Sequence, residues 1–363
     1  MKHLIISGKQ CAGKLALVFL LGVSVVLAQD RLPSENLFYM VDSEESFRSF
    51  RENVEQISVV SPQTFYHEES GVIWGDLDPR VRTLADKHQI RVVPLVLNAG
   101  FNREEFHAFL QDEFAQERAI QQLIEIGQQF DIDGWQFDYE NIHIADRDAF
   151  TAYYRNTAKA LHKSGMEISI AVVPRDGNYA GPTSYHQFMQ KYWRGGYDLP
   201  ALADAGDFIS YMTYSQHTRF TTPGPVAGYP WVESLVQFAL DQGVPAKKLS
   251  LGIPFYSYHW YPQYSAEDGG RVWANGIPYR EAVSLLDRYG AASTWLPDQK
   301  VSMAFWDNDG LFEYLFMEDQ RSLDAKLDLV EKYNLRGISV WRLGQEDPKM
   351  WKVLQTQLSP QND

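Results

Sequence analysis

The chain has 363 residues, of which 45% are hydrophobic and 22% are charged, the balance of a soluble globular protein. Its aromatic content of 14% gives ample apolar surface for a packed core, which excludes disorder as the main state. The formal net charge of -14 argues against nucleic acid as a partner, because phosphate binding needs a basic face.

The first residues have the pattern of a secretory signal peptide. Lysines precede an apolar run over residues 15–28, which is too short to span a bilayer and ends before Gln29. We expect residues 1–28 to be removed, leaving a secreted or periplasmic protein without a stable membrane anchor; an uncleaved anchor is the alternative. The single cysteine, Cys11, lies before this cut, so the mature chain would have no thiol for a disulfide or a metal.

No motif predicts a cofactor or a metal site. Residues Gly8–Lys14 have the spacing of a phosphate-binding loop, but Leu15 stands where that loop needs a hydroxyl for magnesium. His143 has no companion at ligand spacing, and the zinc motif H-E-x-x-H does not occur. We therefore expect no nucleotide, cofactor or metal.

Beyond the signal, strand-like and helix-like segments alternate along the chain. The expected strands are Leu37–Val41, Ile57–Val60, Arg91–Asn98, Gly134–Glu140, Glu167–Pro174, Asp207–Tyr214, Leu249–Tyr256 and Gly337–Leu343. The expected helices are Ser43–Val54, Arg80–Gln89, Glu105–Phe130, Asp146–Ser164, Trp231–Gln242 and Asp324–Tyr333. Near-continuous apolar strands with helical crossovers predict an α/β fold, namely a (β/α)8 TIM barrel; an open doubly wound sheet is the alternative.

The connection between the seventh and eighth strands is too long for a single helix. From Trp260 to Arg336 it contains strand-like pieces, including Val301–Trp306 and Glu313–Phe316. We predict an insertion around residues 261–336 on the upper rim of the barrel, within one domain that spans residues 29–363.

The fourth strand carries an unusual alternation of polar and aromatic residues. Side chains alternate between the faces of a strand, so Gln136, Asp138 and Glu140 share one face. That face would point into the barrel, where Val, Ile and Leu are usual, and Glu140 would lie nearest the catalytic end. Two neighbouring carboxyl groups cannot both ionise freely, which keeps one as an acid at neutral pH. A buried polar network without catalysis is the alternative.

The run Asp133-Gly134-x-x-x-Asp138-x-Glu140 resembles the signature D-G-x-D-x-D-x-E of glycoside hydrolase family 18, the chitinase-like and spore-cortex-type enzymes. Further similarities follow in the order of that family. They are Met212-Thr213-Tyr214 at the sixth strand, Leu251–Tyr256 at the seventh and Gly337–Leu343, with Trp341, at the eighth. The resemblance covers most of the chain beyond the signal and implies a barrel fold.

The resemblance also implies a substrate-assisted mechanism, in which the 2-acetamido group of the sugar acts as the nucleophile. Glu140 would protonate the leaving oxygen and then activate water, and Asp138 would hold the acetamide N–H. Tyr214 would bind the acetamide oxygen, and Trp341 would stack under the sugar. Ordinary barrel packing is the alternative for both aromatic residues.

This sequence departs from the family pattern at two positions. Gln136 replaces the middle aspartate, so it cannot exchange a proton with Asp138, although it can donate a hydrogen bond to it. Ser215 replaces the aspartate that follows Tyr214, which removes a charge near the expected site. Both changes leave the acid Glu140 in place.

Other substrate contacts are predicted from their positions at strand ends. Asn98 follows the third strand, Met212 lies at the sixth, and Tyr256 begins an aromatic cluster at the exit of the seventh. Sugars present apolar C–H faces, so aromatic side chains beside a barrel mouth fit a glycan cleft; packing of the insertion is the alternative. We count Gln136 and Trp341 among the substrate-binding residues, and Asp133 and Gly134 as structural parts of the motif.

The leading hypothesis is a retaining hydrolase of β-linked N-acetylglucosamine-containing glycans, such as chitin oligomers or peptidoglycan. A glycan-binding protein without activity is the first alternative. An ordinary glycosidase with two catalytic carboxylates is the second, but Asp138 is the sole obvious neighbour of Glu140 in the sequence.

Overall fold

The computed structural model describes residues 32–263 and 271–360. The expected signal peptide, Cys11 and the Gly8–Lys14 motif lie outside these ranges. In the described part of the chain, no helix combines the length and the apolar character needed to cross a membrane.

Eight parallel strands close into a barrel, which confirms the predicted (β/α)8 fold and excludes the open sheet. The ring closes because β1 pairs in parallel with both β2 and β15. The barrel strands are β1 (Leu32–Met40), β2 (Val59–His67), β5 (Leu95–Asn98), β6 (Gly134–Asp138), β7 (Glu167–Val172), β8 (Phe208–Tyr211), β9 (Leu249–Pro254) and β15 (Gly337–Trp341). The short strands β3 (Ile73–Gly75), β4 (Arg91–Val92) and β16 (Leu358–Pro360) pair with β2 or β1.

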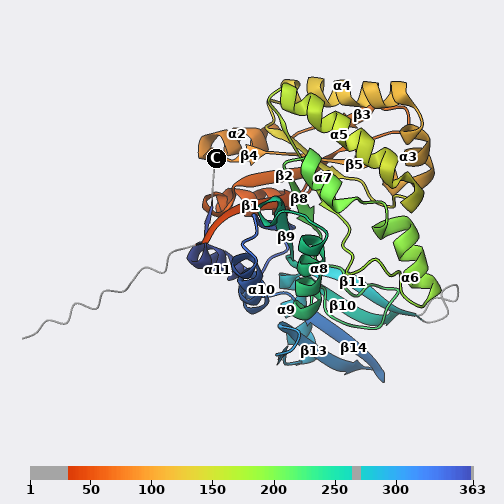
Figure 1. The fold of residues 1–363 in the computed structure, drawn as a ribbon. Coiled ribbons are helices and arrows are strands. Elements are labelled where there is room, and N and C mark those ends of the chain that lie inside the picture. The colour runs from red at the N-terminus through yellow and green to blue at the C-terminus, as the bar shows by residue number, and fades with distance from the viewer. Residues whose placement is uncertain (1–31, 264–270, 361–363) are drawn as a thin grey trace, which may run out of the picture. The chain divides into compact units, whose positions relative to one another are not determined.

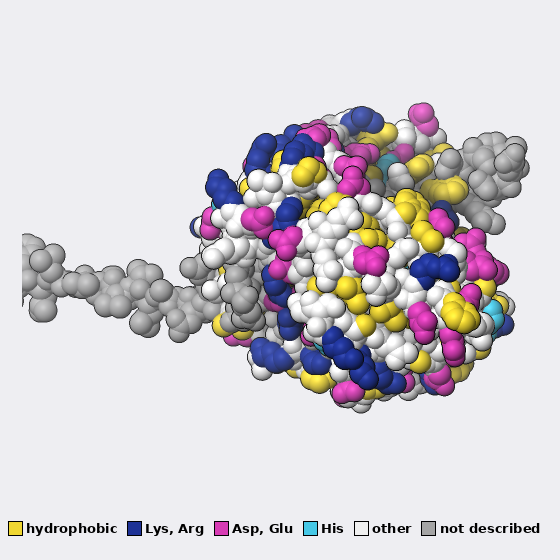
Figure 2. Space-filling model, turned by 90° about the horizontal axis from the view of Figure 1, so that it is seen from above, with side chains coloured by type: hydrophobic (Ala, Val, Ile, Leu, Met, Phe, Trp, Pro, Cys, Tyr) yellow, Lys and Arg dark blue, Asp and Glu magenta, His cyan; other side chains and the backbone are white. Residues whose placement is uncertain are grey.

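Helices surround the barrel, and α2 to α5 lie together on one side of it (Figure 1). The helices are α1 (Glu44–Glu52), α2 (Pro79–His88), α3 (Arg103–Leu110), α4 (Glu113–Gln129), α5 (Arg147–Lys163), α6 (Ser184–Met189), α7 (Leu199–Ala205), α8 (Tyr229–Asp241), α9 (Tyr279–Tyr289), α10 (Gln320–Lys332) and α11 (Met350–Gln357). Acidic and basic side chains are interspersed on the face shown in Figure 2, so the net charge forms no large single-sign patch there.

Some predicted elements differ from the structure, and the sequence gives a local reason for two of the differences. The expected helix Glu105–Phe130 is two helices, because the Asp112 side chain accepts hydrogen bonds from the backbone of Phe114 and Ala115 and thereby begins α4. The second strand was expected over Ile57–Val60, but β2 continues to His67. Pro62 and the register shift at Gln63/Phe65 interrupt the regular alternation of this longer strand.

The insertion between β9 and β15 forms an antiparallel sheet in the order β11-β10-β14-β13-β12. Its strands are β10 (Tyr256–Gln263), β11 (Arg271–Pro278), β12 (Thr294–Leu296), β13 (Val301–Asn308) and β14 (Leu311–Met317), with α9 packed on the sheet. The sheet therefore begins before the expected residue 261. The expected range also includes α10, which packs on β9 and α11 of the barrel. In Figure 1 the sheet projects on the side opposite α4.

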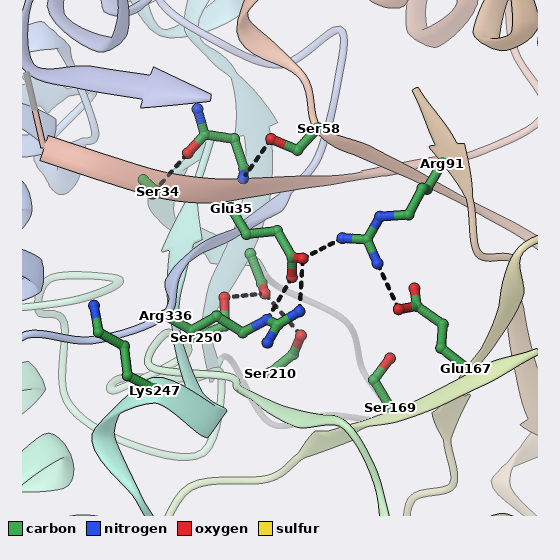
Figure 3. A network of polar contacts seen from close by, with 12 residues as sticks. Ser34, Glu35, Ser58, Arg91, Glu167, Ser169, Ser210, Lys247, Ser250 and Arg336 are labelled. Atoms are coloured by element: carbon green, nitrogen blue, oxygen red, sulfur yellow. Dashed lines mark hydrogen bonds and ion pairs between the residues drawn. The ribbon is translucent and has the colours of Figure 1, made fainter. Parts of the chain in front are cut away.

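An ionic network closes the N-terminal end of the barrel (Figure 3). Glu35 of β1 accepts two hydrogen bonds from Arg336, both at 2.7 Å, and also pairs with Arg91. Arg91 in turn contacts the Glu167 carboxylate at 2.5 Å. Because active sites of such barrels lie at the other end, this network serves stability.

Candidate active site

Glu140 lies just beyond the C-terminal end of β6, where the chain turns out of the barrel. Asn141 follows it in the left-handed conformation, with a φ of 58°, which Asn tolerates better than most residues. The Asn141 amide fixes this turn by donating to the Phe101 carbonyl at 3.0 Å. The turn directs Glu140 to the wall of a cleft.

The alternation expected along β6 is confirmed. Trp135, Phe137 and Tyr139 are fully buried among the apolar residues that join the barrel to its helices. The Trp135 indole donates to the Leu123 carbonyl of α4 at 3.0 Å, so this face of β6 packs against the helices outside the barrel. Gln136 and Asp138 consequently face the barrel interior.

Burial keeps the two carboxyl groups of the motif from ionising freely. Asp138 is 5% exposed and its Oδ1 atom has no hydrogen-bond partner in the described part of the chain. Burial raises the pKa of Asp138 to about 7. Burial first, and the charge of Asp138 second, raise the pKa of Glu140 well above its ordinary value. Burial thus favours the protonated form of Glu140, and the neighbouring Asp138 has a pKa close to neutral pH.

Asn98, expected as a substrate contact, instead binds the backbone of Glu140. Its side chain accepts from the Glu140 N–H and donates to the Glu140 carbonyl, each at 3.0 Å. Asn98 is 3% exposed and is not part of the cleft wall. Its geometry therefore fits a residue that positions Glu140, because both polar ends of its amide are already used.

Gln136 is fully buried and also does not line the cleft. Its amide donates to the Tyr39 hydroxyl at 3.0 Å and accepts a hydrogen bond from Ser169. The expected contact with Asp138 is replaced by this link across the barrel interior. Gln136 thus belongs to the polar residues that fill the barrel interior.

The cleft has a volume of about 830 Å³ and a largely aromatic wall. It is bounded by the connections after β7, β8 and β15 and by the first two strands of the insertion. The predicted residues Glu140, Met212, Tyr214, Tyr256 and Trp341 all line it. The structure thus brings together residues that are far apart in the sequence.

Tyrosine side chains surround the position of Ser215. The Ser215 hydroxyl lies 2.9 Å from the Tyr256 hydroxyl, and Tyr258 donates to it at 3.4 Å. Tyr214 is 9% exposed, and burial raises its pKa well above 10, so its phenol stays protonated as a hydrogen-bond donor. Where the resembled pattern has a charge, this chain has a neutral hydroxyl network.

Trp341 ends β15 and lines the cleft. Its ring packs against Tyr39 of the barrel interior, with the ring centroids 5.6 Å apart. The peptide bond to Arg342, which also lines the cleft, is cis. Trp341 therefore connects the inner core of the barrel with the cleft surface.

The first two residues of the motif are structural. Asp133 accepts from the Val92 N–H at 2.7 Å and pairs with Arg82 at 3.1 Å. A side chain at Gly134 would meet the backbone of Glu167 at 2.4 Å, so only glycine allows β6 and β7 to approach here. Both residues lie at the end of β6 opposite Glu140.

Sequence reasoning missed several parts of the cleft. Phe188 and Arg194 come from the connection between β7 and α7, and Arg219 and Phe220 from the one between β8 and α8. The length and aromatic content of these connections were the available signal, because binding residues often lie on long barrel loops. Among the described residues, no group of three or more His, Cys, Asp or Glu could hold a metal.

Fold and site together define a barrel glycoside hydrolase, with a partly buried carboxyl group at the wall of an aromatic cleft. The chain belongs to the glycosyl hydrolases family 18, whose model matches residues 55–346. The family resemblance seen in the sequence is thereby confirmed.

Individual relatives and solved structures are consistent with this family and with this fold. The cortical fragment-lytic enzyme of Bacillus subtilis (strain 168) is 26% identical over 323 residues, covering 87% of this chain and 72% of that protein. The crystal structure of the Bacillus cereus spore cortex-lytic enzyme SleL matches with a TM-score of 0.82 at 20% identity, covering 92% of this chain and 76% of that one. The crystal structure of the chitinase from Chromobacterium violaceum ATCC 12472 matches with a TM-score of 0.78 at 24% identity, covering 89% of this chain and 98% of that one. At these identities the two structures bear on the fold alone.

Proposed function

We propose that this protein is a retaining hydrolase that cleaves β-linked N-acetylglucosamine-containing glycans with assistance from the substrate. The observation that carries the proposal is the partly buried Glu140 at the cleft wall, with its raised pKa and with Asp138 two residues before it on β6. A carboxyl group that keeps its proton at neutral pH can serve as a general acid. Family membership and the lytic enzymes among the relatives support this reading.

The first chemical step breaks the glycosidic bond. Glu140 gives its proton to the glycosidic oxygen while the carbonyl oxygen of the 2-acetamido group attacks C1, forming an oxazolinium ion. Asp138, when ionised, accepts a hydrogen bond from the acetamide N–H and stabilises the positive charge. The Tyr214 phenol, held protonated by burial, donates to the acetamide oxygen as this oxygen turns toward C1.

The second step restores the enzyme. The Glu140 carboxylate takes a proton from water, whose oxygen attacks C1 from the side that the leaving group vacated. The oxazolinium ring opens, the acetamide is regenerated, and the product keeps the β configuration. Trp341 would support the sugar ring through both steps by stacking on its apolar face.

Glu140→Gln tests the assignment of the acid. With an aryl N-acetylglucosaminide or chitobioside reporter, we expect kcat to fall by about 10²- to 10⁴-fold, the usual contribution of a general acid. The exposed Glu55→Gln is a matched control that should retain the wild-type rate. Wild-type kcat in Glu140→Gln would refute the assignment, and binding of chitooligosaccharides without any cleavage by the wild type would favour a glycan-binding protein.

Two measurements test the assistance from the substrate. A reporter with a hydroxyl in place of the 2-acetamido group should react far more slowly, because it lacks the nucleophile. Proton NMR of the fresh product should show the β anomer first. Equal rates on both reporters, or the α anomer first, would contradict this mechanism.

We also propose that the protein acts outside the cytoplasm after removal of residues 1–28. The basic start and short apolar run support this proposal. N-terminal sequencing of exported protein should begin near Gln29.

A further inference from the structure

Three arginine side chains line the same cleft as Glu140: Arg194, Arg219 and Arg342. They come from separate parts of the chain, namely the short π-helix η4 (Gln190–Arg194), the loop after β8 and the loop after β15. Over residues 32–263 and 271–360, none of their guanidinium groups has a carboxylate partner, and the buried Nε of Arg194 has no hydrogen-bond partner.

Three other partly buried arginines of the barrel have carboxylate partners. Arg82, Arg91 and Arg336 each form an ion pair with a carboxylate. Unpaired guanidinium groups are costly where water is partly excluded. Arg342 is such a group, because partial burial lowers its pKa. The cleft therefore holds cationic groups whose counter-charge the described chain does not supply.

The charge of the cleft is opposite to that of the molecule. The formal net charge of the chain is -14, yet Glu140 is the one acidic residue among the described residues that line the cleft. Three guanidinium groups face this single carboxyl group in the lining, and burial raises the pKa of Glu140 well above its ordinary value, which disfavours its charged form. The described lining is therefore net positive at the place where substrate would bind.

We propose that the cleft selects glycans that carry a carboxylate next to the N-acetylglucosamine unit, as in a muramic acid residue, over neutral chitin oligomers. This inference rests on the proposed function. A guanidinium group offers paired N–H donors that match both oxygens of a carboxylate. Arg219 lies 4.9 Å from the Phe220 ring centroid and 5.7 Å from that of Trp273, so aromatic surface holds its charged group beside the sugar path.

A pair of substrates that differ only at the carboxyl groups tests the proposal. The probes are a tetrasaccharide of alternating N-acetylglucosamine and N-acetylmuramic acid and the methyl ester of the same compound. We expect kcat/KM for the free acid to exceed that for the ester by about tenfold or more, since hydrogen bonds to charged groups are the stronger ones. This preference should shrink as salt is raised from low to high ionic strength.

Variants locate the source of the preference. Arg194→Gln, Arg219→Gln and Arg342→Gln should each lower the acid-to-ester ratio, and the triple variant should bring it to about one. Arg155→Gln, on the exposed surface of α5 and away from the cleft, makes the same charge change and should leave the ratio unaltered. An unchanged ratio in the triple variant would overturn the proposal.

Binding measurements separate this proposal from the proposed function. Calorimetry with Glu140→Gln compares the affinities for the acid and the ester without any turnover. An acid preference in binding supports the role of the arginines even if the wild type cleaves nothing, which would refute only the hydrolase. Equal affinities for acid and ester, or equal preference for a 6-O-sulfated chitotetraose, would overturn the selection of carboxylates.

Discussion

Asn98 clamps the backbone of Glu140, accepting from its N–H and donating to its carbonyl at 3.0 Å each. The clamp joins the end of β5 to the turn after β6, so two neighbouring strands fix the acid in place. Because misplacement of a catalytic group by about 1 Å can cost 10²-fold in rate, the position of this backbone matters for catalysis.

We expect Asn98→Ala to lower kcat by about 10- to 100-fold with a smaller change in KM, because it removes both hydrogen bonds to Glu140. Asn98→Asp keeps the acceptor for the N–H but brings a negative charge close to Glu140. The alkaline limb of its pH–rate profile should therefore move to higher pH. Steady-state kinetics over pH measures both effects. An Asn98→Ala variant that loses only thermal stability, with unchanged kcat, would show that the clamp is merely structural.

The pH dependence of the wild type should follow the carboxyl pair. In the proposed mechanism Asp138 acts ionised and Glu140 acts protonated, so kcat/KM should rise as pH increases through about 7 and fall once Glu140, whose pKa is raised, loses its proton. In Asp138→Asn the acid limb should disappear. The alkaline limb should move to lower pH, because the charge that raises the pKa of Glu140 is gone. A wild-type optimum near pH 4 would contradict this assignment.

Asp138 should also lower the free energy of unfolding at alkaline pH. Its pKa in the folded chain, about 7, lies above the ordinary 3.8, so the folded state binds the proton more tightly than the unfolded state. The contribution of this group to stability is therefore present at low pH and is lost as pH rises through about 7. We expect Asp138→Asn to have the higher free energy of unfolding at pH 8 and a shrinking advantage toward pH 4. Urea titrations at both pH values measure this difference, and a constant difference would contradict it.

The ionic network at the other end of the barrel should affect stability without affecting catalysis. Glu35→Gln leaves Arg336 and Arg91 without their shared carboxylate, and we expect a loss of about 3 kcal/mol in the free energy of unfolding. Glu233→Gln, which breaks a partly exposed pair with Lys332, is the control and should cost about 1 kcal/mol or less. The rate per folded molecule of Glu35→Gln should match the wild type. A marked fall in kcat would mean that the network reaches the active site.

The sequence by itself determined the order of strands and helices and hence the barrel. Period-two alternation in Gly134–Glu140 and apolar runs such as Leu249–Pro254 are local patterns that arise from burial on one or both faces of a strand. The motif also placed Asp138 inside the barrel and Glu140 at its mouth, because alternation fixes the face and strand direction fixes the end.

Only the tertiary structure decided what each polar side chain contacts. Asn98 and Gln136 were expected to meet substrate, yet the first binds the backbone of Glu140 and the second binds Tyr39, a residue 97 positions away. The sequence also did not predict that Arg194, Arg219 and Arg342 line the same cleft. Contacts between distant segments depend on how barrel closure and loop packing bring strand ends together, and no local periodicity encodes that geometry.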